Sequence, residues 1–455
     1  MKHTLTIRVE DYANLRTQLA ALPDVEAAAY LFCGRSVTAF ETRLLARTVL
    51  PVEEGDYLVR EPDRLSIASP SYTAVAKRAA AEGESVLFVH SHPGGRGLFS
   101  GQDDREEPKL MKFLTERDPG VPHGSLVLGT DPELSGRVWT TRGWAPLDRV
   151  RLLGGRFRFL PQGPLGPAND IGPFFDRQVR AFGPDIQSLL GSLHVGVVGL
   201  GGTGSAVAEQ LCRLGVGEIS LFDGEVLEPS NVSRVYGSTA TNVGRPKALI
   251  ASDHLKGIGL NTAVHTVSRP ITEQEAAKTL RDCDVVFGCT DRQAPRAILT
   301  NLALYYLIPV FDVGVKIDSP GRIIQSVDGR LTVLWPGYAC LFCRGRISPE
   351  VIRLEGLSPE EQRLRAQEGY APALETRAPA VITFTTSVAA KAVAEFLQSL
   401  TGWMGSDTAS EFLLRFDHDV IRSSSLPPSP TCYCSQRERW GRGDRKRFLD
   451  LAWAA

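Results

Sequence analysis

The stretch VVGLGGTGSAVAEQ, residues 197–210, decides the fold of the larger part of the chain. A short apolar strand runs into a glycine-rich turn, and a helical run follows. The glycines of this turn are Gly199, Gly201, Gly202 and Gly204. Glycines at such a turn let the backbone approach a phosphate at a helix N-terminus. Strand-like and helical runs continue to alternate after it, which predicts a Rossmann-like, doubly wound parallel sheet.

The glycine turn alone fits either a dinucleotide or a nucleoside triphosphate. Asp223 ends the next predicted strand, where a carboxylate could bind a ribose hydroxyl. Polar and charged side chains further along favour a triphosphate with magnesium over hydride transfer. They are Asn231, Arg234, Lys247 and Asp291.

This set of residues resembles the ubiquitin-activating and ThiF/MoeB adenylating family over about residues 174–400. The resemblance implies ATP- and Mg²⁺-dependent adenylation of a terminal glycine carboxylate, and a homodimer. In FFDRQVRAFG, Arg177 resembles the family's arginine that reaches ATP across the dimer.

Many members of that family carry a nucleophilic cysteine in the loop before the last helix. The corresponding segment here, residues 358–384, has none, and Thr376 stands at its place. A hydroxyl is a weak nucleophile without a base. We therefore favour direct transfer of the adenylate to a second protein. A Thr376 oxyester, or another residue acting after a loop movement, is the alternative, and Thr376 also fits a plain loop or helix-cap role.

A second motif, VHSHPGGRGLFSGQDD at residues 89–104, has the residue types of a metal site. His90 and His92 are two residues apart at the end of a predicted strand, so both rings point to one face. With Asp103 they would leave one position open on a tetrahedral zinc ion, as catalytic sites do. Zinc lowers the pKa of its bound water to about 7. Glu26, before a strand expected to lie alongside, is the candidate general base, and Ser100 the candidate oxyanion donor.

The full pattern H-x-H-P-x6-S-x-x-D resembles the JAB/JAMM (MPN-domain) metalloprotease family. The resemblance assigns His90, His92 and Asp103 as ligands, Ser100 as oxyanion support and Glu26 as the base. It implies hydrolysis of a peptide or isopeptide bond at the C-terminus of a ubiquitin-like protein, as a deubiquitinase does.

The eight cysteines divide into two groups of four. Two close pairs, in GYACLFCRG and SPTCYCSQ, suit a closed structural zinc site. These are Cys340, Cys343, Cys432 and Cys434. The other four are expected to be core residues in strands or helices. They are Cys33, Cys212, Cys283 and Cys289.

The expected organisation is α/β throughout. A JAB/MPN-type domain occupies residues 1–150, a Gly- and Pro-rich linker 151–173, and a ThiF-type adenylation domain with the cysteine tail 174–455. The basic run RERWGRGDRKR near the C-terminus is expected to be a solvated surface end.

The overall composition of the chain bears on which classes of binding partner and which cellular location to expect. The formal net charge of -1 gives no reason to expect a nucleic acid or an anionic membrane. No apolar run approaches the roughly 18 residues that span a bilayer, so we expect a cytoplasmic protein without a disulfide framework.

Both resemblances point to one substrate, the C-terminal tail of a ubiquitin-like protein. Fusions of this kind resemble components of bacterial ubiquitin-like conjugation systems, some of them linked to antiphage defence, with a conjugating-enzyme-like protein as a possible partner. Two alternatives stay open: sulfur-carrier activation to a thiocarboxylate with precursor processing, and a non-catalytic scaffold that binds the ubiquitin-like tail.

Overall fold

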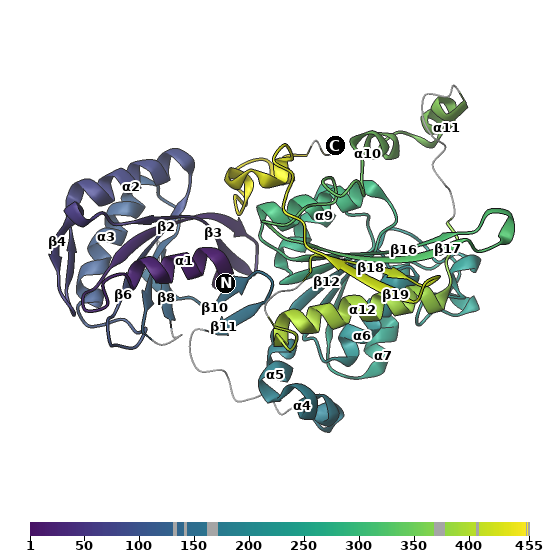
Figure 1. Cartoon of the computed structure of the whole chain (residues 1–455), viewed down its shortest axis with the longest axis horizontal. Coiled ribbons are helices and arrows are strands. Elements are labelled where there is room, and N and C mark those ends of the chain that lie inside the picture. The colour runs from purple at the N-terminus through teal and green to yellow at the C-terminus, as the bar shows by residue number, and fades with distance from the viewer. Residues whose placement is uncertain are drawn as a thin grey trace. The chain divides into compact units, whose positions relative to one another are not determined.

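The computed structural model divides the chain into two compact units (Figure 1). The first contains Met1–Leu165 together with Arg437–Asp450, and the second contains Gly166–Gln436 and Leu451–Ala455. The structure describes residues 1–130, 134–140, 143–161, 172–367, 378–405, 409–451 and 453.

A nine-stranded mixed sheet forms the first unit. In spatial order its strands are β11 (Arg158–Pro161), β10 (Arg149–Leu153), β1 (Lys2–Arg8), β3 (Glu41–Pro51), β2 (Ala28–Val37), β6 (Ser85–Ser91), β7 (His123–Leu128), β8 (Leu134–Thr140) and β9 (Gly143–Pro146). A separate hairpin joins β4 (Tyr57–Arg60) and β5 (Leu65–Ile67). The helices are α1 (Val9–Leu19), α2 (Ser69–Glu82) and α3 (Asp103–Arg117).

Helix α1 covers one face of this sheet, and α2 and α3 cover the other (Figure 1). The central strands β2 and β6 are therefore buried on both faces, which explains their near-continuous apolar runs. Helix α2 ends at Gly83, whose φ of +60° gives the left-handed C-terminal cap that glycine adopts without strain. The result is a rigid frame for the end of β6, where the histidine motif lies.

The sheet continues past the predicted domain boundary at residue 150. Strand β10 pairs in parallel with β1, and β11 pairs with β10, so much of the expected linker is part of the first unit. Phe157 and Phe159 are both buried. Their alternation with arginine in RFRFL is a strand signal that the Gly- and Pro-rich surroundings hid.

The basic C-terminal run is not a solvated end, contrary to expectation. Trp440 is buried, and the guanidinium groups of Arg8 and Arg437 lie 4.7 and 4.9 Å from its ring centre. Further along, Gly443 pairs with Arg35, and Arg445 forms an ion pair with Glu84 at 3.1 Å. The segment Arg437–Asp450, here called the C-terminal strap, is thus an integral part of the first unit.

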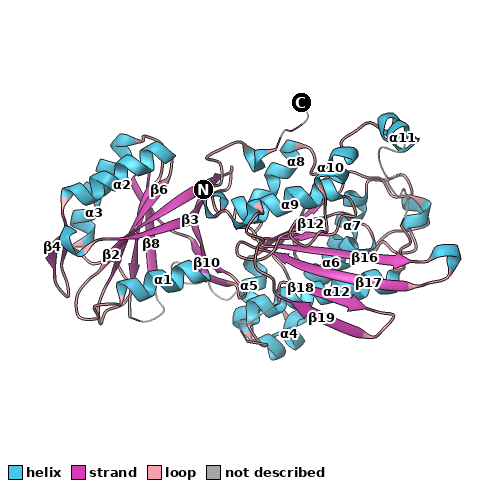
Figure 2. Cartoon of the chain, turned by 45° about the horizontal axis from the view of Figure 1, so that its top comes forward, coloured by secondary structure: helices cyan, strands magenta, loops and turns pink. Residues whose placement is uncertain are grey.

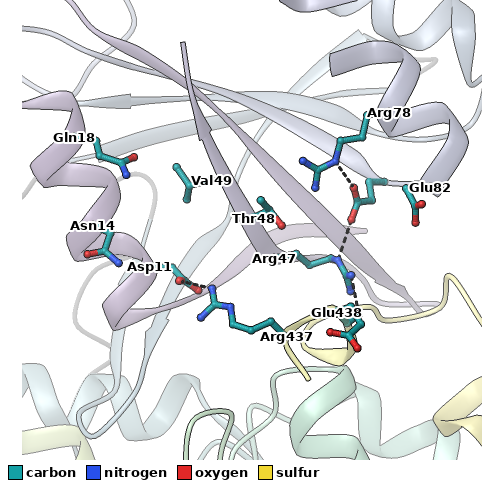
Figure 3. A pocket seen from close by; sticks show the side chains of 11 residues that line it. Asp11, Asn14, Gln18, Arg47, Thr48, Val49, Arg78, Glu82, Arg437 and Glu438 are labelled. Atoms are coloured by element: carbon teal, nitrogen blue, oxygen red, sulfur yellow. Dashed lines mark hydrogen bonds and ion pairs between the residues drawn. The ribbon is translucent and has the colours of Figure 1, made fainter. Parts of the chain in front are cut away.

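The strap also borders a cavity of about 700 Å³ (Figure 3). Its walls come from α1, the second half of β3, the end of α2 and the strap. Ion pairs Arg47–Glu84 and Arg437–Asp11 cross its lining at 2.9 and 3.0 Å. None of the predicted site residues lines this cavity.

The second unit has an eight-stranded sheet with helices on both faces (Figures 1 and 2). In spatial order its strands are β14 (Ala263–Val267), β13 (Glu218–Phe222), β12 (His194–Val198), β15 (Val285–Gly288), β16 (Val310–Asp318), β17 (Ser326–Leu334), β18 (Glu411–Arg415) and β19 (Val420–Ser424). The helices are α4 (Asp176–Phe182), α5 (Pro184–Ser192), α6 (Gly202–Arg213), α7 (Lys247–Ile258), α8 (Gln274–Thr279), α9 (Gln293–Tyr305), α10 (Pro349–Glu355), α11 (Pro359–Gln367) and α12 (Ile382–Thr401).

The first five strands of this sheet are parallel, and the last three are antiparallel. Helix α9 lies on one face, whereas α6, α7 and α12 lie on the other (Figures 1 and 2). This confirms the doubly wound α/β prediction. Strand order reverses between β12 and β15, the position where such sheets bind ligands at the carboxyl ends of their strands. Among the described residues, no helix is both long and apolar enough to cross a bilayer.

Candidate metal and nucleotide sites

Three predicted metal ligands of the first unit come together at the end of β6. His90 is buried in the strand, His92 follows directly after it, and Asp103 is the first residue of α3. His90 Nε2 lies 3.2 Å from His92 Nε2 and 3.1 Å from Asp103 Oδ1. His92 Nε2 lies 3.4 Å from Asp103 Oδ2.

These separations fit a single zinc ion. Bonds of about 2.0–2.1 Å in a tetrahedron place neighbouring donors about 3.3 Å apart. The separations between the three ligand side chains are close to that value, with Asp103 presenting Oδ1 to His90 and Oδ2 to His92. Two imidazoles and one carboxylate also leave the fourth tetrahedral position open, as catalytic zinc sites do.

Glu26 lies beside this cluster, as predicted. Its side chain is buried, and its Oε1 is 3.7 Å from His92 Nε2. The register explains the placement, since Ala28 of β2 pairs with His90 of β6 and Glu26 precedes Ala28 by two residues. A carboxylate at this distance from the ligands could take a proton from a reacting water.

Ser100 makes reciprocal hydrogen bonds with Asp103. Its N–H donates to Asp103 Oδ2 at 2.6 Å, and its hydroxyl accepts the Asp103 N–H at 3.2 Å. The serine therefore orients the third ligand in addition to any role toward an oxyanion.

The cluster favours an anionic Asp103. Burial opposes its ionisation, but hydrogen bonds from His90 and His92 hold the pKa of Asp103 below its usual range. The hydrogen bond to Asp103 in turn raises the pKa of His92. Burial raises the pKa of Glu26, and charges on the two histidines act in the opposite direction. An anionic Asp103 beside two imidazoles is a ligand set that a divalent cation would bind.

A charged network next to the ligands was not predicted. Arg137 of β8 is buried and donates to Asp104 Oδ1 at 2.6 Å and to Glu107 Oε2 at 2.8 Å. Glu107 also accepts the Ser125 hydroxyl at 2.6 Å. Burial raises the pKa of Glu107, whereas the Ser125 hydrogen bond and a charge on His90 act to lower it. The spacing of Asp103 and Glu107, one helical turn apart, is the signal that could have identified this carboxylate.

In the second unit, the glycine turn joins β12 to α6 at the reversal of strand order. Gly199 has a φ of +84°, a conformation that favours glycine. Its α-carbon lies against the loop after β15, because an added Cβ would be 2.8 Å from the carbonyl oxygen of Cys289. A Cβ on Gly204 would be 1.7 Å from the carbonyl oxygen of Gly199. The turn is thus packed too tightly for side chains at these two positions.

We expect Gly204→Ala to destabilise the second unit by about 3 kcal/mol or more, because the methyl group and the Gly199 carbonyl oxygen cannot share one position. The melting temperature of that unit and ATP binding, followed by calorimetry, should both fall. Gly201→Ala is the matched control for the melting temperature, since a Cβ there meets no protein atom within 4 Å. A Gly204→Ala chain that melts like the wild type would contradict this close packing.

Asp223 and Asn231 shape the loop around this turn. Asp223 is buried after β13, and its carboxylate accepts the N–H groups of Leu200 and Glu225 at 2.7 and 2.8 Å. Burial raises the pKa of Asp223, and these two hydrogen bonds oppose the shift. The side chain of Asn231 accepts the Glu228 N–H at 3.2 Å and caps a short helical turn.

The predicted cationic residues lie around the same turn. Arg234 donates to the Ser230 carbonyl oxygen at 2.7 Å, and its side chain lies against Gly202. Lys247 begins α7, and its Nζ lies 2.6 Å from Glu225 Oε2. Its ammonium group is therefore already paired with a carboxylate beside the turn.

The structure describes the positions of two further predicted residues, Asp291 and Arg177, but not that of Thr376. Asp291 is exposed, in the loop after β15 whose Cys289 touches Gly199. Arg177 is exposed on α4. Thr376 lies outside the described residues.

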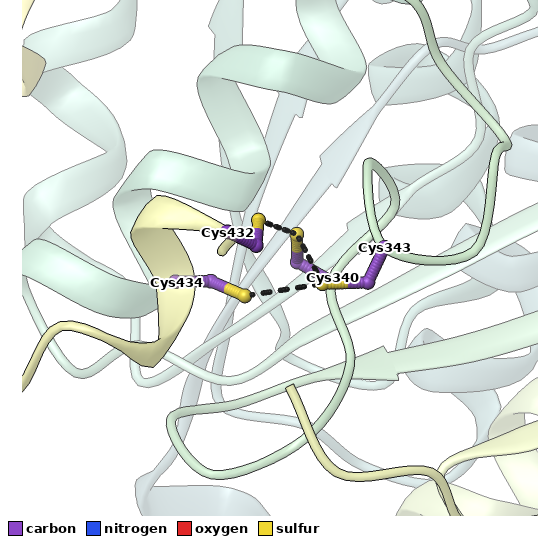
Figure 4. Close-up of side chains that lie close together, drawn as sticks. All are labelled: Cys340, Cys343, Cys432 and Cys434. Atoms are coloured by element: carbon purple, nitrogen blue, oxygen red, sulfur yellow. Dashed lines mark hydrogen bonds between the residues drawn. The ribbon is translucent and has the colours of Figure 1, made fainter. Parts of the chain in front are cut away.

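The four cysteines predicted to bind zinc converge within the second unit (Figure 4). Cys340 Sγ lies 3.8 Å from Cys343 Sγ and 3.6 Å from Cys432 Sγ, and Cys343 and Cys434 are 3.4 Å apart. Zn–S bonds of about 2.3 Å place tetrahedral sulfurs about 3.8 Å apart. Hydrogen bonding with Cys434 lowers the pKa of Cys340 to about 6. The donor set fits a closed zinc site.

The remaining cysteines match the core prediction at three positions. Cys33, Cys212 and Cys283 are fully buried, although Cys283 lies just before β15 and not within a strand or helix as predicted. Cys289 differs, because it is partly exposed in the loop after β15, outside any strand or helix.

Two family profiles match the chain. The ThiF family profile matches residues 175–435, and the profile for prokaryotic homologs of the JAB domain matches residues 9–142. These matches confirm both resemblances drawn from the sequence.

Curated relatives each match a little over a third of this chain, as three of them illustrate. The molybdopterin-synthase adenylyltransferase of Escherichia coli is 31% identical over 170 residues, covering 37% of this chain and 66% of that protein. The SAMP-activating enzyme E1 of Haloferax volcanii is 29% identical over 168 residues, covering 37% and 59%. The sulfur carrier protein adenylyltransferase of Thermus thermophilus is 30% identical over 163 residues, covering 35% and 59%. The chain spans less than two thirds of the length of each of these relatives.

Proposed function

Because the chain belongs to the ThiF family and also carries a domain homologous to prokaryotic JAB proteins, we propose that it has two activities on one substrate. It adenylates the C-terminal glycine of a ubiquitin-like protein with ATP, and it hydrolyses peptide or isopeptide bonds at that same C-terminus. One observation carries the proposal: a single chain joins three donors spaced for one tetrahedral ion to a glycine turn at the reversal point of a Rossmann-like sheet.

The adenylating half would hold ATP across the carboxyl ends of β12 and β15. Backbone N–H groups at the start of α6 face the phosphates. Arg234 and Lys247 neutralise phosphate charge, for which Lys247 exchanges its pairing with Glu225. Asp291 holds Mg²⁺, and Arg177 reaches the ATP of a second copy in a homodimer.

The hydrolytic half uses the cluster at the end of β6. His90, His92 and Asp103 would hold zinc, which supplies Lewis acidity and an activated water when bound. Glu26 accepts a proton from the attacking water and returns it to the leaving amine. Ser100 orients Asp103 and can donate its hydroxyl to the developing oxyanion.

The four-cysteine cluster would hold a second, structural zinc ion. It fixes the turn after Cys340 to the segment that precedes the C-terminal strap. We propose that the adenylate passes directly to a second protein such as a conjugating enzyme, and that a Thr376 oxyester is the alternative route.

A second candidate function is sulfur-carrier activation. The names of two relatives favour it, since one is a sulfur carrier protein adenylyltransferase and another a molybdopterin-synthase adenylyltransferase. In that case the adenylate is converted to a thiocarboxylate. Incubation of the adenylated carrier with a sulfide donor or with an amine acceptor, followed by mass spectrometry, separates the two products.

The first test of the function is pyrophosphate release from ATP. The purified chain is mixed with a ubiquitin-like protein encoded beside it, supplied both full length and trimmed to its terminal glycine. We expect release with the trimmed form and a loss of at least about a hundredfold in Asp291→Ala, because about 2.7 kcal/mol or more of phosphate-charge stabilisation depends on the metal. Release from the full-length form only while His92 is intact would support precursor processing. Retained release in Asp291→Ala would contradict the assigned role.

A further inference from the structure

Helix α3 carries a second carboxylate on the face that presents Asp103. Glu107 follows Asp103 by four residues, so both side chains lie on one side of the helix. Its Oε2 accepts the Ser125 hydroxyl of β7 and the Arg137 guanidinium of β8. Ser125 pairs in register with Phe88, two residues before His90 in β6. Glu107 therefore lies over the same sheet face as the His90 ring.

Several buried polar atoms in this region lack hydrogen-bond partners among the described residues, and two of them bear on the metal site. One is Oε1 of Glu107, the oxygen that Ser125 and Arg137 leave free. The other is Nδ1 of His90, whose Nε2 faces the ligand cluster. Buried polar atoms without partners are uncommon in folded proteins, so a pair consisting of a potential acceptor and a potential donor calls for an explanation.

We propose that Glu107 is a positioning residue for the metal site, with its free Oε1 accepting the Nδ1–H of His90 when Nε2 binds the ion. This inference rests on the proposed function, because it requires zinc at His90, His92 and Asp103. A histidine that binds metal through Nε2 must carry its proton on Nδ1. Ligating histidines almost always donate that N–H to a carboxylate, a carbonyl group or water, which fixes the ring and strengthens the ligand.

Arg137 has the complementary role of holding the carboxylate. Its guanidinium lies over the ring of Phe99, 3.9 Å from the ring centre. It also donates hydrogen bonds to Asp104 and Glu107. A single side chain of β8 thereby fixes the first two turns of α3, from which Asp103 reaches the cluster. The guanidinium carries only donors, and it donates to Oε2 of Glu107. This contact holds Oε2 toward the arginine and leaves Oε1 on the other side of the carboxylate.

The test is the zinc affinity of the full-length Glu107→Gln chain. Because Arg137 and Ser125 are both donors toward Oε2, the amide oxygen of glutamine is drawn to them. The amide NH₂ then faces the Nδ1–H of His90, donor against donor. We expect the dissociation constant for zinc at this site to rise about 10- to 100-fold. Glu106→Gln is the matched control, since that side chain is 59% exposed on the same helix.

The measurement is competition with a chelator, with Co²⁺ substituted for zinc in a parallel experiment. Thiolate absorption separates the four-cysteine site from the nitrogen–oxygen site, so each ion is followed by itself. The melting temperature of the metal-free chain is recorded as well. A purely structural role would lower it while leaving the zinc affinity of the folded chain unchanged. Arg137→Lys keeps the charge but loses the planar, two-pronged guanidinium. This second variant is also expected to raise the dissociation constant for zinc.

Three outcomes are distinguishable. A Glu107→Gln dissociation constant at least about tenfold above wild type, with Glu106→Gln unchanged, supports the inference. Zinc bound at wild-type affinity in Glu107→Gln overturns this inference and leaves the proposed hydrolase intact. If the His92→Ala chain binds as much zinc as the wild-type chain, the proposed metal site and this inference are both overturned.

Discussion

His92→Ala is expected to abolish hydrolysis while pyrophosphate release from ATP continues at the wild-type rate. The substitution removes one of three donors that lie 3.1–3.4 Å apart, so the site can no longer hold zinc as a three-ligand centre. Loss of a Lewis acid removes several kcal/mol of transition-state stabilisation, and each 1.36 kcal/mol is a factor of ten. Cleavage should therefore fall at least about a thousandfold.

The assay is cleavage of a reporter fused to the C-terminus of the neighbouring ubiquitin-like protein. Asp291→Ala is the reciprocal control, in which cleavage is retained and pyrophosphate release is lost. The two variants together test whether the sites are independent. If His92→Ala removed both activities without changing the melting profile, the independent-sites interpretation would be wrong.

A chain that ends at Gln436 is expected to lose the folded first unit. The deletion removes the C-terminal strap, including the buried side chains of Trp440, Phe448 and Leu449. It also leaves Glu84 without the ion pair to Arg445. Loss of one large buried aromatic side chain costs about 3–5 kcal/mol. Two such losses are comparable with the entire stability of a typical domain, about 5–15 kcal/mol.

Scanning calorimetry of the full and shortened chains checks this expectation. The transition of the first unit should disappear or move to much lower temperature, and that of the second unit should stay. A chain ending at Asp450 is the control, because it keeps the strap and removes only the last five residues of the sequence. Trp440→Ala should give an intermediate loss. An unchanged first transition in the chain ending at Gln436 would show that the strap is dispensable.

The features that were predictable from the sequence are local. Each of the two main motifs, the glycine turn at 199–204 and the histidine motif at 90–103, has its functional residues close together in the sequence. The alternation of predicted strands and helices indicated the fold around them. The two cysteine pairs are separate in sequence, but each pair is itself a recognisable local motif.

The features that were missed depend on contacts between distant residues. Arg137 binds Asp104 from 33 residues away, and no local pattern in β8 marks it as a partner of α3. Trp440 packs on Arg8 of β1 at the other end of the chain. A short basic run with one tryptophan is usually exposed, and only its contacts with Arg8, Arg35 and Glu84 make it a buried segment here. Strand β11 was hidden for a different reason, since flanking glycines and prolines outweighed its short alternation.

The strap also sets the order in which a ribosome can complete this protein. The first unit's sheet ends at Pro161, yet its last segment begins only at Arg437. At about 5–20 residues per second, roughly 15–55 s of synthesis separate the two. During that interval the nascent sheet carries an unfilled site for Trp440, and residues 166–436 of the second unit emerge and can fold first. The first unit is thus completed only after residues 166–436 of the second unit are made, so it would reach its full stability only in a chain whose ThiF-family segment is already translated.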